Sequence, residues 1–212
     1  MTSSTHAQFQ TLHEMPDYDY FFKNFLAKNV PCLIKNSFVG QWKSSRDWVK
    51  GEKPNLEFFQ ELSNLEVPVY DCRAKYFNSH EAKPWPLQDY LKYWESRDER
   101  LLYLKDWHFR MACPKYQAYS VPVIFASDWL NEYCDATGKL CEDYRFVYIG
   151  PKDSFTPFHS DVFNSFSWSA NVVGKKLWIF VPPGKEKSLV KISGSLPTDI
   201  QTGNNFEKCH HS

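Results

Sequence analysis

Residues 144–183 read YRFVYIGPKDSFTPFHSDVFNSFSWSANVVGKKLWIFVPP, and this stretch decides the fold that the sequence predicts. It is rich in aromatic and β-branched residues, which favour strands, and Gly and Pro interrupt it at short intervals. Four strand candidates follow one another, at residues 144–150, 156–163, 165–173 and 175–183. Because the connections are too short to contain helices, the pattern predicts antiparallel hairpins.

The rest of the chain predicts helices packed against strands, an α+β class that is mainly β. Asp17, Ser44 and Asn55 are expected to cap helices, and Gly138 is typical of a helix end. Residues 1–16 are polar and expected to be frayed, and residues 78–85 are predicted to form a loop broken by prolines. Helices are predicted at residues 17–29, 44–51, 56–64, from about residue 86, and 127–138; strands are predicted at 30–38, 67–73 and 100–107.

Composition excludes several classes of function. Lys and Arg number 25 and Asp and Glu number 25, so the chain has no basic footprint for nucleic acid and no polybasic patch for a membrane surface. No apolar run is long enough for a transmembrane helix, and the N-terminal residues lack the apolar segment of a signal peptide. A cytoplasmic or nuclear location is therefore expected.

The six cysteines form no C-x-x-C pair and no regular framework. In a reducing compartment such cysteines are expected to be buried free thiols. A zinc site made from Cys134, Cys141, Cys209 and His210 is the competing interpretation, but these residues lack the spacing of ligand pairs.

His159 and Asp161 are the candidate reactive pair. Residues two apart on a strand point to the same face, so an imidazole and a carboxylate would project together. They would supply two of the three ligands in the 2-His-1-carboxylate triad of non-haem iron oxygenases. Such a pair also occurs by accident, and a hydrogen-bonded core histidine is the alternative reading.

Three further residues favour a dicarboxylate ligand near this pair. Thr156 precedes His159 by three residues, and Lys176 lies in an otherwise apolar strand, where an ammonium is costly unless it meets an anion or solvent. Tyr103 lies mid-strand with a hydroxyl that needs a partner if it is buried. Two hydroxyls and an ammonium suit a carboxylate. The plainer interpretations are a Lys that reaches solvent at a sheet edge and an ordinary core aromatic residue.

With these residues identified, the chain resembles the JmjC family of iron- and 2-oxoglutarate-dependent oxygenases, in the branch of the protein hydroxylases. The resemblance extends from about Phe21 to about Asp199. The segments that carry it are LYLKDWH (102–108), SDWLNEYCDA (127–136), YRFVYIGP (144–151), TPFHSDVFNSFSWSANVVGKKLW (156–178) and FVPPGKE (180–186).

The resemblance implies a double-stranded β-helix, a cupin-like jelly roll of eight strands closed against N-terminal helices. The four strand candidates correspond to the first half of that barrel. The implied division is a flexible N-terminus at 1–16, a helical N-terminal part at 17–100, the first half of the β-helix at 101–190, and a loop or tail at 191–212.

The resemblance also implies roles for individual residues. His159 and Asp161 match the first two ligands of Fe(II). Thr156 and Lys176 match residues that hold the distal carboxylate of 2-oxoglutarate, and Tyr103 matches a tyrosine that assists them. Related members have Asn at the position of Ser169, and Asn171 is the expected substitute on the same strand face.

The third iron ligand of the family, a His on the seventh strand, has no counterpart in the sequence. The only later histidines, His210 and His211, lie in a stretch without a strand pattern. The chain is therefore expected to be truncated at its C-terminal end, with unpaired strand edges and little hydroxylase activity on its own.

The implied function is protein hydroxylation with Fe(II) and 2-oxoglutarate. The resemblance implies a protein substrate, a lysyl side chain of the eukaryotic translation release factor, and hence a role in translation termination. The alternatives are a non-catalytic pseudo-enzyme or binding module and, with less support, a histone lysine demethylase.

Overall fold

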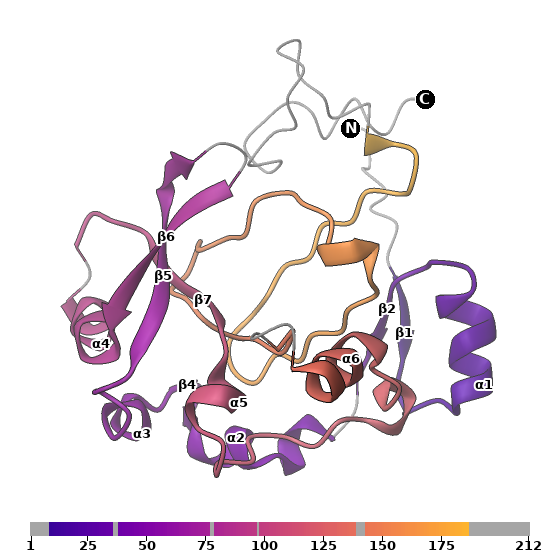
Figure 1. Cartoon of the computed structure of the whole chain (residues 1–212), viewed down its shortest axis with the longest axis horizontal. Coiled ribbons are helices and arrows are strands. Elements are labelled where there is room, and N and C mark those ends of the chain that lie inside the picture. The colour runs from indigo at the N-terminus through magenta and orange to yellow at the C-terminus, as the bar shows by residue number, and fades with distance from the viewer. Residues whose placement is uncertain (1–8, 36–37, 77–78, 97, 139–142, 187–212) are drawn as a thin grey trace, which may run out of the picture.

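A computed structural model of the chain describes residues 9–35, 38–76, 79–96, 98–138 and 143–186. Its main sheet has four antiparallel strands in the order β6-β5-β7-β8. These strands are β5 (Glu66–Tyr76), β6 (Ser79–Pro86), β7 (Leu102–Trp107) and β8 (Val147–Ile149). In Figure 1 the sheet lies on one side of the molecule, and the coil that follows β8 passes between it and the small β1–β2 sheet. The predicted α+β class is confirmed.

One face of the main sheet packs against helices α3 (Leu56–Gln60) and α4 (Leu87–Ser96), and α4 lies beside β5 and β6 in Figure 1. Burial of apolar side chains between these layers supplies the main stabilisation of the fold. The buried core cluster consists of Trp48, Phe59, Val67, Val69, Leu87, Tyr90, Leu91, Tyr93, Leu102, Leu104, Trp107, Phe109 and Ala118.

Two tyrosines of α4 tie the helix to the sheet. The hydroxyl of Tyr90, which is fully buried, donates to the carbonyl of Ile149 (2.6 Å) and accepts from the amide of Leu104 (3.2 Å). The Tyr93 hydroxyl accepts from the amide of Leu102 at 3.0 Å. Tyr90 thereby bridges β7 and β8 next to the point where their register shifts, between Leu104 and Trp107.

The N-terminal segment is more ordered than its polar sequence predicts. Strand β1 (Gln10–Leu12) pairs in parallel with β2 (Cys32–Ile34), so the prediction that residues 1–16 are frayed is wrong for this part. Between them lie α1 (Tyr18–Phe21) and a π-helical turn, η1 (Phe22–Leu26). Asp17 caps α1 as predicted, because its carboxylate accepts from the amide of Tyr20 at 2.8 Å.

The two predicted short helices that follow are present, but their caps differ. Helix α2 (Lys43–Asp47) begins at Trp42 without a side-chain cap, and Gly51 turns a small hairpin of β3 (Val49–Lys50) and β4 (Lys53–Pro54) instead of ending the helix. Ser44 is buried inside α2. Asn55 precedes α3 as predicted, but its side-chain amide donates to the carbonyl of Asp47 (2.8 Å).

The predicted proline-broken loop at residues 78–85 is wrong, because Ser79–Pro86 forms strand β6. A proline lacks the amide that a central strand must donate, but β6 lies at the edge of the sheet, where one side of the strand needs no partner. Pro84 pairs with Pro68 of β5 in this register.

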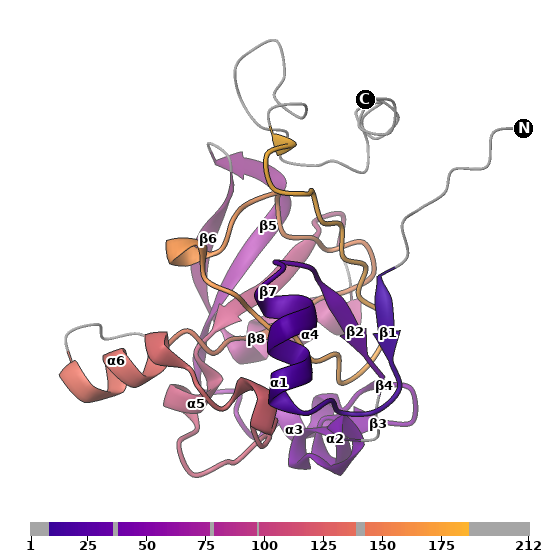
Figure 2. The same ribbon diagram turned by 90° about the vertical axis from the view of Figure 1, so that its right-hand side faces the viewer.

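Helix α6 (Trp129–Thr137) matches the prediction closely. The Asp128 carboxylate accepts from the amide of Asn131 at 3.1 Å, and Gly138 ends the helix in the left-handed conformation (φ 59°). Figure 2 shows α6 projecting from one side of the molecule, and its Trp129 and Tyr133 are exposed. Between β7 and α6 the chain forms the short helices α5 (Phe109–Ala112) and η3 (Val123–Phe125).

Of the four strands predicted after residue 143, the structure contains only β8. The predicted strands at 156–163, 165–173 and 175–183 are irregular, apart from the turn η4 (Val162–Asn164). A side-chain pattern does not make a strand unless a second extended segment lies beside it to complete the hydrogen bonds. Within the described residues none does, and ring contacts hold the coil in place instead, notably Trp168 stacked on Phe125 (5.1 Å between centroids).

Candidate functional site

His159 and Asp161 face each other at the start of this coil. The two side chains are about half exposed, and His159 Nε2 lies 3.4 Å from Asp161 Oδ1. The other ring nitrogen, Nδ1, is 2.7 Å from the carbonyl oxygen of Pro157. Since a carbonyl only accepts, Nδ1 carries a proton and donates it to Pro157, so Nε2 is the ring nitrogen that faces the carboxylate.

This arrangement fits a divalent metal ion. Imidazole nitrogen and carboxylate oxygen ligands lie about 2.0–2.2 Å from a bound transition metal, so atoms 3.4 Å apart can both reach one ion. The hydrogen bond from Nδ1 to Pro157 is the kind of outer contact that fixes the orientation and tautomer of a ligand histidine. The hydrogen bond between the two side chains lowers the pKa of Asp161 and raises the pKa of His159, so a proton on Nε2 bridges them, and a metal ion would take the place of that proton.

Lys176, later in the same coil, lies against Tyr148 of β8, whose ring neighbours that of Tyr103. Its ammonium lies 4.7 Å from the centre of the Tyr148 ring and 4.4 Å from that of Trp178. Much of the side chain remains exposed, but the rings desolvate the ammonium and lower its pKa, against the opposing effect of the Asp106 carboxylate.

Tyr103 is buried on the face of the sheet opposite α4, beside Tyr148 of the neighbouring strand (6.1 Å between ring centroids). Burial, with smaller contributions from Cys72 and Asp106, raises the pKa of Tyr103 to about 12, so the hydroxyl stays protonated and able to donate. We call this side of the sheet the inner face. It carries Tyr70, which pairs with Tyr103 in the ladder, as well as Tyr103, Lys105 and Tyr148.

Among the described residues, no hydrogen bond or ion pair joins Thr156 or Asn171 to Lys176 or Tyr103. Thr156 is exposed. The Asn171 side chain donates to the carbonyl of Gly174 (2.8 Å) and so stabilises its own turn. Their proposed contacts with a co-substrate remain predictions.

Sequence reasoning missed a charged cluster on the inner face. Lys105 is buried, and its Nζ lies 3.7 Å from Asp106 Oδ2. Alternation along β7 predicts that Asp106 points away from Lys105, but Asp106 has a left-handed backbone (φ 59°), which turns its carboxylate toward the Tyr148 hydroxyl (3.0 Å). A non-glycine residue with positive φ has no signature in the residue pattern, although Asp tolerates it better than most.

The third metal ligand is not found in the part of the chain that the structure describes, where no group of three or more His, Cys, Asp or Glu side chains is placed to hold an ion. His210 and His211 lie outside the described residues. Of the alternative zinc site, Cys134 is a buried free thiol, whereas Cys141, Cys209 and His210 lie outside the described residues. Cys72 is also a buried free thiol, as predicted, whereas Cys32 and Cys113 are free thiols that are only partly buried.

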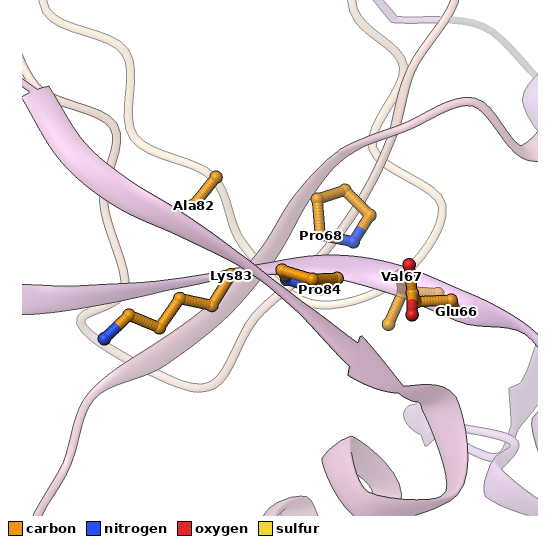
Figure 3. Close-up of a pocket in the computed structure, with 6 residues that line it drawn as sticks. All are labelled: Glu66, Val67, Pro68, Ala82, Lys83 and Pro84. Atoms are coloured by element: carbon orange, nitrogen blue, oxygen red, sulfur yellow. The ribbon is translucent and has the colours of Figure 1, made fainter.

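A shallow pocket of about 260 Å³ lies on β5 and β6, away from the His159–Asp161 pair. Figure 3 shows that Lys83 extends outward from it. Prolines and short side chains provide most of its walls, so it offers little chemistry; the lining residues are Glu66, Val67, Pro68, Ala82, Lys83 and Pro84. The described helices include none that is long and apolar enough to cross a membrane.

Comparisons with known proteins identify one family and several relatives of this chain. A family profile described as a cupin-like domain matches residues 19–208. The 2-oxoglutarate and iron-dependent oxygenase JMJD4 of Gallus gallus is 44% identical over 207 residues, which cover 93% of this chain and 48% of that protein. The human protein of the same name is 41% identical, with coverage of 86% and 46%.

A plant relative has a different named activity. The arginine-specific demethylase JMJ20 of Arabidopsis thaliana is 40% identical over 184 residues, which cover 78% of this chain and 40% of that protein. The chain therefore spans about half the length of the curated relatives that it matches.

Proposed function

The chain belongs to the cupin-like domain family, and on that premise we propose that it is an iron(II)- and 2-oxoglutarate-dependent oxygenase that hydroxylates a protein. One observation carries the proposal. His159 Nε2 and the carboxylate of Asp161 lie 3.4 Å apart, and the Pro157 carbonyl accepts from Nδ1 on the other side of the ring. The names of the relatives, which specify 2-oxoglutarate and iron, support the same chemistry.

In this proposal His159 Nε2 and Asp161 Oδ1 bind Fe(II), and Lys176 binds the distal carboxylate of 2-oxoglutarate. Tyr103, which stays protonated, assists Lys176 as a hydrogen-bond donor, and Thr156 and Asn171 are the further candidates for this carboxylate. When bound, iron and 2-oxoglutarate would supply the oxidising power: one oxygen atom of O₂ would enter an unactivated C–H bond, and the other would enter 2-oxoglutarate as it loses CO₂ to become succinate. The protein's part is to hold both in a fixed geometry.

Metal and co-substrate binding tests the proposal directly. Mn(II), a redox-inert substitute for Fe(II), should bind the 212-residue protein, and 2-oxoglutarate should bind only when the metal is present. Because loss of an outer contact to a metal ligand already costs roughly 10- to 100-fold in affinity, His159→Ala should weaken Mn(II) binding by at least about 100-fold. Electron paramagnetic resonance of free Mn(II) measures this affinity.

His13→Ala is the matched control, because it removes an exposed histidine in the N-terminal segment and should leave Mn(II) affinity unchanged. If His159→Ala and His13→Ala bind Mn(II) equally, the pair is not a metal site. A wild-type protein that binds neither Mn(II) nor 2-oxoglutarate would instead support a non-catalytic binding module.

The substrate within this proposal is a lysyl side chain of the eukaryotic translation release factor, and the sequence resemblance supports it. The plant relative makes demethylation of arginine the competing reaction, and histone lysine demethylation is a further alternative. Mass spectrometry of candidate peptides separates these reactions, since hydroxylation adds an oxygen atom and demethylation removes a methylene unit. Demethylated product without hydroxylated product would contradict the proposal.

A further inference from the structure

Lys105 is a buried cation that the described residues only partly neutralise. Its side chain is 6% exposed, and its ammonium lies over the Tyr70 ring, 4.3 Å from the ring centre. Within the described residues its one ion pair is with Asp106, at 3.7 Å, which is too long for a hydrogen bond. A buried ammonium is costly unless it donates hydrogen bonds, so this geometry leaves donors for an anion.

Lys105 also lies on the same face of the sheet as Tyr103. Alternation along β7 places it on the inner face with Tyr103, two residues away. Burial, together with the charge of Lys105, lowers the pKa of His80. The Nδ1 atom of His80 is itself buried without a hydrogen-bond partner among the described residues.

Asp106 links Lys105 to the second cation of the site. Its carboxylate accepts from the Tyr148 hydroxyl at 3.0 Å, and the ring of that tyrosine lies under the ammonium of Lys176. Asp106 also opposes the lowering of the pKa of Lys176, so its carboxylate lies within electrostatic reach of both lysines. The two ammonium groups thus flank one carboxylate that the protein itself supplies.

We propose that Lys105 is a second carboxylate-binding cation of the co-substrate site, and that Asp106 neutralises it until a dicarboxylate arrives. The inference rests on the proposed function, because 2-oxoglutarate is the dicarboxylate in question. On binding, the ligand carboxylate takes the hydrogen bonds that Asp106 is too distant to accept. Asp106 keeps Tyr148 as its partner and needs no rearrangement.

Calorimetric titration of 2-oxoglutarate into the Mn(II)-loaded 212-residue protein tests this inference. Hydrogen bonds to charged groups are worth about 1.5–3 kcal/mol, so Lys105→Met should weaken 2-oxoglutarate binding by about 10- to 100-fold. Lys43→Met is the matched control, because Lys43 also lies over a tyrosine ring, that of Tyr116 (4.2 Å), but on α2. It should leave the affinity unchanged.

Mn(II) affinity distinguishes a binding role from a structural one. Removing a positive charge from the inner face does not weaken the binding of a cation, so Lys105→Met should bind Mn(II) as tightly as the wild type or more tightly. General damage to the fold would weaken Mn(II) and 2-oxoglutarate binding together. Such a parallel loss would overturn the inference.

Asp106→Asn provides a second, opposite test. The amide oxygen can still accept from Tyr148, but the negative charge that competes with the ligand is removed, so 2-oxoglutarate affinity should rise several-fold. Unchanged affinity in Lys105→Met, or unchanged or weaker affinity in Asp106→Asn, would overturn the inference. If the wild type binds Mn(II) but no 2-oxoglutarate, the proposed function is wrong as well.

Discussion

Gly150 shows how closely single residues are fitted around the candidate site. It follows β8 at the point where the chain leaves the sheet, and its missing side chain makes room for the ring of Tyr103. A Cβ atom at position 150 would lie 2.5 Å from Tyr103 Cδ2 and 2.2 Å from Ser154 Oγ. The Ser154 hydroxyl can rotate away, whereas the Tyr103 ring is buried and cannot move without disturbing its neighbours.

Gly150→Ala should therefore displace Tyr103 and weaken 2-oxoglutarate binding by about tenfold, which corresponds to roughly 1.4 kcal/mol. Overpacking should also reduce the free energy of unfolding by about 1–3 kcal/mol. Titration calorimetry and urea denaturation measure the two effects. Gly40→Ala is the control, because its Cβ would meet no atom within 4 Å. Equal 2-oxoglutarate affinities in the two variants would show that Tyr103 does not take part in 2-oxoglutarate binding.

At the scale of residues, the sequence predicts some pairs of neighbouring side chains but not others. His159 and Asp161 come together as strand alternation suggests, although the segment that carries them is not a strand. Alternation fails at Asp106, because one left-handed residue reverses the direction of a side chain. Alternation along β7 puts Lys105 on the face of Tyr103, but only the structure shows that it is buried beside Asp106.

At the scale of elements, the junction between β7 and β8 depends on a side chain from α4. The Tyr90 hydroxyl donates to the carbonyl of Ile149 and accepts from the amide of Leu104. It thus completes backbone hydrogen bonds at the position where the strand register begins to shift. The shift allows Asp106 to turn inward, so the helix helps to position the charged cluster.

Tyr90→Phe removes the hydroxyl that bonds the Leu104 amide and the Ile149 carbonyl, and both backbone groups would then be buried without this hydrogen-bond partner. Each unsatisfied group costs about 1–3 kcal/mol, so the free energy of unfolding measured in urea should fall by at least about 1–3 kcal/mol. Tyr133→Phe, on the exposed face of α6, should change it by less than about 0.5 kcal/mol. A Tyr90→Phe variant as stable as Tyr133→Phe would contradict this role.

Helix α6 was the helix best predicted from sequence, because Gly138 ends it as expected, whereas Ser44 does not cap α2 and Gly51 does not end it. The strand β6 was missed because its prolines normally exclude a strand, and only its place at the sheet edge permits them. The strands predicted after residue 155 have the right composition. Pairing is a relation between two segments, so composition alone could not decide it.

At the scale of the molecule, the coil of residues 156–183 joins the candidate site to both ends of the fold. The Phe155 carbonyl, just before it, accepts from the thiol of Cys72 in β5, and Phe180 packs on Phe9 near the N-terminus. Figure 1 shows the coil crossing the space between the two sheets. Several of its large apolar side chains are exposed: Val162, Phe163, Phe166, Leu177, Trp178 and Phe180.

Hydrogen–deuterium exchange should therefore divide the molecule into two parts. Amides of β5 and β7 are bonded within the sheet and should exchange only by large-scale opening, whereas amides at 165–183, which lack ladder bonds, should exchange at the earliest times. Helix α4 serves as an internal control, because its amides are bonded within the helix and its Leu87 and Tyr90 are fully buried.

Ligands should change this exchange pattern in one place. Mn(II) and 2-oxoglutarate would join His159 and Asp161 to Lys176, so exchange should slow between these residues and remain unchanged in α6, which is distant in sequence and exposed. Slow exchange at 165–173 in the ligand-free protein, equal to that of β7, would show that these residues are paired as a strand after all. Strand pairing would then hold the backbone around His159, Asp161 and Lys176 in place. Bound Mn(II) and 2-oxoglutarate would not be needed to fix these side chains relative to one another.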